Sequence, residues 1–181
     1  KDITELIPEH LRTTIVLPRW VRINTLKGDM KTAKYFFDKD GWKEIPFDDF
    51  FKQLDDLQAA QKGDEKEKKD KRLGKVYCHD RDLPDLLAFP PMTDFHDHQL
   101  LLSGHMVLQD KASALSGAAL EVPASQESVA LDACAAPGQK TSQVAQTMRN
   151  MGRLFAFDLD MMRLETLKKL CKRNGLKNLT A

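Results

Sequence analysis

The sequence predicts an α/β fold, with an open parallel sheet in its last third and a small α+β unit before it. Three observations support this prediction. Two short apolar segments between residues 128 and 157 each lead into a segment of helical periodicity, as in the strand–helix units of parallel sheets. Residues 17–26 alternate in polarity, which is typical of a strand. The 181 residues, 41% of them hydrophobic, suffice for one ordinary domain or two small ones.

The first predicted strand is LPRWVRINTL, residues 17–26. Val21 and Ile23 fall on one face, and Trp20 and Arg22 on the other, because successive side chains of a strand alternate. Cations and an aromatic ring on one strand can meet the phosphates and bases of RNA, or can form a plain exposed strand face. Both interpretations stay open for Arg19, Trp20, Arg22 and Lys27.

The elements that follow are short, and turn residues separate them. They are a helix over residues 30–40 that stops at Gly41, a short strand over 42–46, a strand over 75–80, a tight connection over 82–91, a strand over 104–110, and a helix over 111–120 that Asp110 caps. The small residues of the last helix suit close packing against a neighbour.

A run of charges of both signs, KGDEKEKKDKRLGK, occupies residues 62–75. Such a segment buries too little surface to offset the entropy of ordering it, so we expect a solvated insertion. A basic arm that binds RNA is the alternative, and the four acidic residues of the run weaken it.

The last third predicts two βα units. Strands are expected over residues 128–134 and 153–160, a helix over 139–152 that ends at Gly152, and the start of a third strand over 176–181. Residues 161–175 predict an amphipathic helix with Met161, Leu164, Leu167 and Cys171 on its buried face. We therefore expect residues 1–122 and 123–181 to form two units, the second an incomplete sheet.

The segment LDACAAPGQKTSQ, residues 131–143, joins the first of these strands to its helix. Ligands of such sheets bind at the carboxyl ends of the strands, and small residues let a ligand approach the backbone. The free N–H groups that open the helix favour a carboxylate or phosphate. Asp158 ends the next strand, where an acid commonly accepts hydrogen bonds from a ribose diol. We therefore expect the ligand to be an adenosine-type cofactor with a small anionic end.

Three loop types compete for this segment. A P-loop fails because Gln139 precedes Lys140, and the dinucleotide fingerprint G-x-G-x-x-G is absent. An S-adenosylmethionine loop remains, because that cofactor has a diol for Asp158 and a carboxylate for the loop. The alternative is a tight strand–helix turn that binds no ligand.

DACAAPGQKTS followed by AFDLDMMR resembles the Sun-domain (NSUN-type) family of RNA cytosine-5 methyltransferases. LPRWVRINTLK and HMVLQDKASAL look like the upstream segments of that family, and LLAFPPMTDFHDH resembles its large-subunit ribosomal RNA branch. The resemblance implies a Rossmann-like S-adenosylmethionine-dependent methyltransferase fold, here its first two βα units, after an RNA-recognition-like subdomain. It also implies S-adenosyl-L-methionine as cofactor, large-subunit ribosomal RNA as partner, and a place in the nucleus and nucleolus. The implied cofactor-binding residues are Cys134, Ala135, Ala136, Pro137, Gly138, Gln139 and Lys140, with Asp158 on the ribose and Arg163 nearby.

The resemblance implies covalent catalysis, in which a cysteine thiolate adds to carbon 6 of the base and a second cysteine helps release the product. The D-P-x-C and T-C-S segments that carry these cysteines in the family do not occur in this sequence. Cys134 lies in the loop without an activating neighbour, and Cys171 lies on a helix face. Cys78 and His79 point to opposite faces of a strand. We therefore name no catalytic residue here and expect this chain alone to be inactive.

Other functions are weaker candidates. His96 and His98 fit no established metal-ligand spacing, so we expect a polar surface loop and no metal. No run of residues is long and apolar enough to span a membrane. The odd number of distant cysteines favours a reducing compartment. We expect a monomer and leave protein partners open. A ribose 2′-hydroxyl RNA methyltransferase, which uses a lysine–aspartate–lysine–glutamate set, is the alternative enzyme. A non-catalytic RNA-binding or assembly fragment is the alternative from another class.

Overall fold

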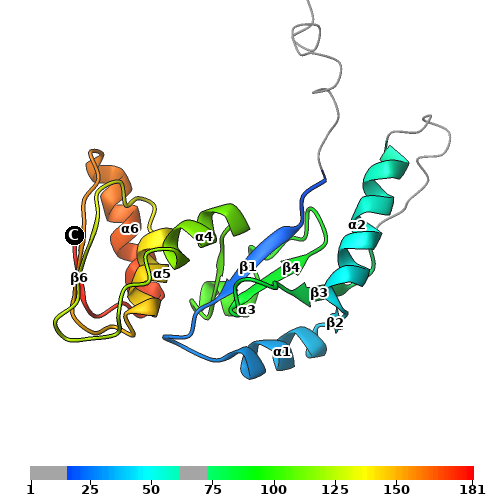
Figure 1. Ribbon diagram of the computed structural model, residues 1–181, viewed down its shortest axis with the longest axis horizontal. Coiled ribbons are helices and arrows are strands. Elements are labelled where there is room, and N and C mark those ends of the chain that lie inside the picture. The colour runs from blue at the N-terminus through cyan, green and yellow to red at the C-terminus, as the bar shows by residue number, and fades with distance from the viewer. Residues whose placement is uncertain (1–15, 62–72) are drawn as a thin grey trace, which may run out of the picture.

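The computed structural model describes residues 16–61 and 73–181. A five-stranded sheet of order β2-β3-β4-β1-β5 forms the N-terminal unit (Figure 1). The central strand β1 runs antiparallel to both β4 and β5, whereas β2 and β3 are parallel. The strands are β1 (Arg19–Ile23), β2 (Lys43–Glu44), β3 (Val76–His79), β4 (Leu86–Phe89) and β5 (Met106–Leu108).

Helices cover both faces of this sheet. They are α1 (Met30–Lys39), α2 (Phe47–Gln61), α3 (Gln99–Leu102) and α4 (Lys111–Ala118). On one face, Phe37 of α1 packs against Phe89 with ring centroids 5.0 Å apart. On the other, Phe50 of α2 shares a core cluster with Trp20 and Leu86. Apart from the exposed Arg19, both faces of β1 are therefore buried. Trp20 and Arg22 thus form neither an exposed strand face nor an open RNA-facing surface, the two alternatives that the sequence left open.

Several predicted elements of this unit are confirmed. The helix α1 begins after Asp29, whose side chain accepts a hydrogen bond from the Thr32 N–H at 2.7 Å, and the chain turns at Gly41 with φ +81°. The predicted strands over 42–46, 75–80 and 104–110 correspond to β2, β3 and β5. Asp110 takes the N-cap position of α4, although its side chain makes no capping hydrogen bond.

The predicted connection over residues 82–91 contains the strand β4, and α2 and α3 were not predicted. All four residues of β4 are buried, and the strand lies between β3 and β1. A four-residue strand next to prolines resembles a loop in sequence. The pairing that makes it a strand is not visible locally, because its partner β1 lies more than sixty residues away in the chain.

The C-terminal unit is a parallel sheet of order β6-β7-β8, which confirms the predicted βα units. Its strands are β6 (Val129–Asp132), β7 (Arg153–Ala156) and β8 (Leu179–Thr180), and its helices are α5 (Gln139–Thr147) and α6 (Met161–Arg173). Asp160 caps α6 and Gly175 follows its end with φ +81°. Figure 1 shows this unit on the left, with α4 between it and the N-terminal sheet. The division of the chain after residue 122 stays a prediction.

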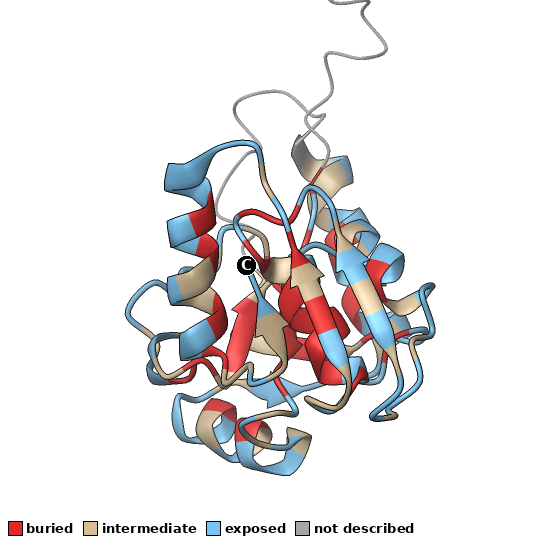
Figure 2. Ribbon diagram, turned by 90° about the vertical axis from the view of Figure 1, so that its left-hand side faces the viewer, coloured by how far each residue is buried: buried red, intermediate tan, exposed pale blue. Residues whose placement is uncertain are grey.

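Three details of the C-terminal unit differ from the predictions. The helix α5 ends at Thr147 rather than Gly152, because Arg149 and Asn150 adopt positive φ angles. The strand β6, expected to be buried, exposes Leu131 to 62% because no described element covers that face of the sheet (Figure 2). Met161 is 66% exposed because it opens α6 beyond the strand ends, so only the later residues of the predicted face are buried.

The strand exit after β1 joins the two units. Asn24 Nδ2 donates to the carbonyl oxygens of Gly104 and Asn174 at 2.7 and 2.8 Å. Lys27 Nζ donates to the carbonyls of Ser103 and Arg173. These groups hold the end of α6 against the N-terminal sheet. Lys27 makes these hydrogen bonds at an exposed position, and its contact with RNA stays a prediction.

Three further sequence predictions concern membrane spans, metal sites and the charged insertion. Across residues 16–61 and 73–181, no helix combines the length and apolar character needed to cross a membrane. In the same residues, His, Cys, Asp and Glu side chains form no group of three that could hold a metal. The insertion predicted over 62–75 falls outside the described residues up to position 72.

Candidate cofactor site

A six-residue loop between β6 and α5 forms the centre of the candidate site. Gly138 ends the loop with φ +110°, a conformation that side-chain-bearing residues rarely adopt. A Cβ atom on Gly138 would lie 3.2 Å from Leu167 Cγ and 3.4 Å from Cys171 Sγ. The glycine therefore allows both the sharp turn and the close packing of the loop against α6.

Asp132, the last residue of β6, ties the two ends of the loop together. Its carboxylate accepts a hydrogen bond from Thr141 Oγ1 at 2.8 Å and one from the Cys134 N–H at 3.3 Å. Thr141 is fully buried in the first turn of α5. The sequence interpretation did not single out Asp132 and Thr141, although an acid at a strand end is a signal that could have found them.

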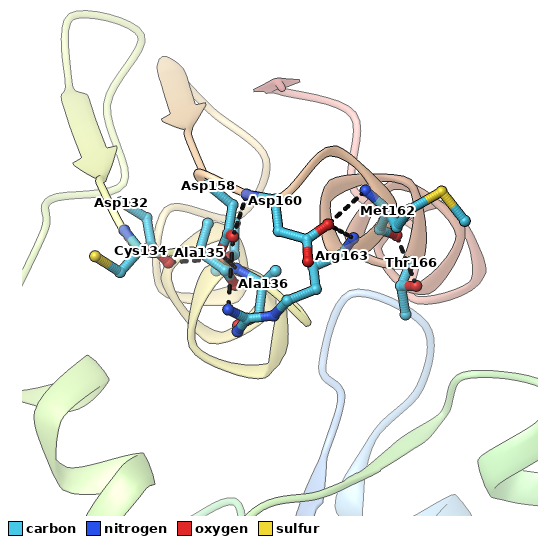
Figure 3. A network of polar contacts seen from close by, with 10 residues as sticks. Asp132, Cys134, Ala135, Ala136, Asp158, Asp160, Met162, Arg163 and Thr166 are labelled. Carbon is cyan, nitrogen blue, oxygen red and sulfur yellow. Dashed lines mark hydrogen bonds and ion pairs between the residues drawn. The ribbon is translucent and has the colours of Figure 1, made fainter.

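Ala136, in the middle of the loop, is held at both its polar groups. Its N–H donates to Asp158 Oδ2 at 3.0 Å, and its carbonyl accepts from Arg163 Nη2 at 2.8 Å (Figure 3). Arg163 Nη1 also lies 3.6 Å from Asp158 Oδ1. Residues at the end of β7 and the start of α6 thus hold the loop in place. Arg163, expected only to lie near the site, bonds to both the loop and Asp158.

The carboxylate of Asp158 is stabilised in its charged form. Hydrogen bonds from the N–H of Asp160 and then of Ala136 lower its pKa, and the Arg163 guanidinium adds to this effect. Its side chain is only 5% exposed. Each carboxylate oxygen can accept more than one hydrogen bond, so both oxygens keep acceptor capacity beyond these contacts.

The structure brings the predicted site residues into one place at the carboxyl ends of β6 and β7. Ala135, Ala136 and Gly138 are buried, whereas Pro137 and Lys140 face solvent and Gln139 is half-buried. Cys134 is exposed, and Figure 3 shows its side chain pointing away from Asp158. Whether these residues bind a cofactor stays a prediction.

The three cysteines differ in reactivity. Burial first, and nearby carboxylates second, raise the pKa of Cys78 and of Cys171 to about 12. Both thiols therefore stay protonated and shielded, as expected for groups that are not nucleophiles. Cys134 is exposed.

Thiol alkylation should separate these cysteines. In the folded protein at mildly alkaline pH, iodoacetamide should modify Cys134 and leave Cys78 and Cys171 intact, because only exposed thiolates react. Peptide mass spectrometry would locate the modification, and the same treatment in denaturant, which should modify all three, is the control. Fast labelling of Cys78 in the folded state would contradict its buried position in β3.

Comparisons with known proteins agree with this geometry. The profile described as NOL1/NOP2/Sun domain family member 5, ferredoxin-like domain, matches residues 17–109. The profile of the 16S rRNA methyltransferase RsmB/F matches residues 119–181.

Curated relatives point the same way. The chain is 39% identical over 160 residues to a 28S rRNA (cytosine-C(5))-methyltransferase of Mus musculus, covering 88% of this chain and 31% of that protein. It is 33% identical over 162 residues to the 25S rRNA (cytosine-C(5))-methyltransferase NSUN5 of Arabidopsis thaliana, covering 90% of this chain and 22% of that protein. The chain thus spans about a third or less of the length of these relatives.

A solved structure supports the fold. The crystal structure of NSun6 from Pyrococcus horikoshii with SFG superposes with a TM-score of 0.68 at 16% identity, covering 93% of this chain and 58% of that one. This likeness confirms the predicted Rossmann-like α/β fold. Since a family profile covers more than half of the chain, the chain belongs to the NOL1/NOP2/Sun domain family, in the group of member 5 with its ferredoxin-like domain.

Proposed function

We propose that this protein methylates carbon 5 of a cytosine in large-subunit ribosomal RNA, with S-adenosyl-L-methionine as the methyl donor. The observation that carries the proposal is the loop at the end of β6, clamped at Ala136 by Asp158 and Arg163. The relatives named as 28S and 25S rRNA cytosine-C(5) methyltransferases support the substrate. We further propose the nucleolus as its location, because ribosomal RNA is made there.

The residues at the loop fit this cofactor. Among the described residues no side chain caps the start of α5 at Gly138, so its first N–H groups are available to an anion such as a carboxylate. The Asp158 carboxylate lies at the adjacent strand end and can accept hydrogen bonds from a ribose diol. The donor set therefore matches the two polar ends of the molecule.

When bound, S-adenosylmethionine would supply an electrophilic methyl group. The N–H groups that open α5 would hold its carboxylate, and Asp158 would orient its ribose. Arg163 positions both Asp158 and the Ala136 carbonyl, while Asp132 and Thr141 keep the loop closed. The thiolate addition to carbon 6 of the base is not assigned to any residue of this chain.

A methyl-transfer assay with the full-length protein tests the proposal. Unmethylated large-subunit ribosomal RNA, transcribed in vitro, would be incubated with labelled S-adenosylmethionine, and the product digested to nucleosides. We expect 5-methylcytidine by mass spectrometry, and none with a small-subunit transcript as control. Label found as a 2′-O-methylated nucleoside, or transfer to both transcripts alike, would overturn the proposal.

A further inference from the structure

The helix α5, which follows the cofactor loop, is buried on a polar face. Ser142, Gln143 and Gln146 are only 2%, 4% and 9% exposed. The opposite face carries Val144 and Met148, which pack on the parallel sheet. The polar face is turned toward the N-terminal unit instead: Gln143 accepts from Gln109 Nε2 at 2.8 Å and donates to the carbonyl of Ala114 at 2.8 Å.

Arg22 of β1 lies at the centre of this polar contact and is fully buried. Its Nη2 donates to Ser142 Oγ at 2.8 Å and to the Gln139 carbonyl at 3.3 Å, and its Nη1 donates to Gln146 Oε1. Its Nε donates to Gln109 Oε1 at 2.7 Å. Three of the four acceptors therefore belong to α5, so the planar guanidinium joins the N-terminal sheet to that helix.

Because the Arg22 guanidinium is buried, its N–H donors need acceptors at well-defined positions. Desolvation lowers the pKa of Arg22 to about 10, and the nearby carboxylate of Asp85 partly offsets the effect. Gln146 Nε2 in turn donates to Asp85 Oδ2, which links the two charges through a neutral amide. A buried cation is tolerated only when its donors are satisfied, so α5 can occupy few positions relative to β1.

We propose that Arg22 is a positioning residue for the cofactor loop, through which the N-terminal sheet holds the first turn of α5. Gln139 directly follows the loop glycine Gly138, and Ser142 lies at the end of the first turn of α5. Among the described contacts, the N-terminal unit hydrogen-bonds to Gln139 and Ser142 through Arg22 alone. The inference rests on the proposed use of S-adenosylmethionine. If Arg22 holds the loop in this way, the N-terminal unit contributes to the cofactor site.

The substitution Arg22→Lys in the full-length protein tests this role. Lysine keeps the positive charge but lacks the planar fork that reaches several acceptors at once. We expect the Kd and KM for S-adenosylmethionine to rise about tenfold, because a charge-assisted hydrogen bond to the first turn is lost. We expect kcat at saturating cofactor and the Kd for ribosomal RNA to stay at the wild-type values. The control is Arg153→Lys, the same exchange at an exposed position at the opposite end of the parallel sheet.

The outcomes separate this inference from the proposed function. Wild-type protein that does not bind S-adenosylmethionine would overturn the proposed function and with it the positioning role. Wild-type protein that binds it, together with Arg22→Lys that binds equally well, would overturn the positioning role alone. Should Arg22→Lys fail to fold, Ser142→Ala decides: a raised Kd for S-adenosylmethionine supports the role, and an unchanged Kd overturns it.

Discussion

Replacing Asp158 with alanine is expected to weaken the binding of S-adenosylmethionine to the full-length protein about a hundredfold, since hydrogen bonds to a charged group are stronger than those between neutral groups. Two losses combine. The ribose diol loses its proposed acceptor, and the Ala136 N–H loses the carboxylate that holds the loop at 3.0 Å. Isothermal titration calorimetry would measure the change.

Glu165→Gln is the matched control, because Glu165 also lies near the start of α6, and within residues 16–61 and 73–181 its carboxylate pairs only with the exposed Lys168. Its cofactor affinity should equal that of the wild type. The pKa of Asp158 lies below its ordinary value of 3.8, so its charge and contacts persist above that pH and are lost as the pH falls through the lowered pKa. Unchanged affinity of Asp158→Ala would remove Asp158 from the cofactor site.

Replacing Gly104 with alanine is expected to destabilise the fold by about 3 kcal/mol, from a strained backbone and a forced overlap. Gly104 has φ +77°, and a Cβ there would lie 2.4 Å from the Arg173 carbonyl oxygen. This obstacle is backbone at the end of α6, which Asn24 and Lys27 already hold in place. The strain therefore cannot be relieved by a side-chain rotation.

Chemical denaturation followed by circular dichroism would measure this loss of stability. Gly74→Ala is the matched control, since a Cβ at this exposed glycine would meet no atom within 4 Å among the residues that the structure describes. We expect that control to change the free energy of unfolding by less than about 0.5 kcal/mol, as is usual for surface positions. Equal stability of the two variants would show that the turn at Gly104 can move away from α6.

The elements that could be predicted are those whose signal is local. The parallel unit was found because apolar strands alternate with helical periodicity, and α1 because Asp29 and Gly41 mark its ends. The strand β4 was missed because it is four residues long and exists through its pairing with β1 and β3. The helix α5 was predicted too long because the turn at Arg149 and Asn150 carries no glycine or proline.

The candidate site was predictable in part for the same reason. The loop and Asp158 follow strand ends, and parallel strands bring those ends to one edge of the sheet. The sequence left Arg22 open between a contact with RNA and a plain exposed strand face, because a cation next to Trp20 on an alternating strand fits both. Its true acceptors, Gln109, Ser142 and Gln146, lie more than eighty residues further along the chain.

The α/β class, the family resemblance and the position of the cofactor loop can be inferred from the amino-acid order, because short distinctive segments carry that information. Which polar residues are buried, and what they bind, depends on contacts between distant parts of the folded chain. Arg22 and Asn24 are buried because α5 and the end of α6 supply acceptors there, and burial of a polar group is tolerated only where a partner from elsewhere in the chain meets it.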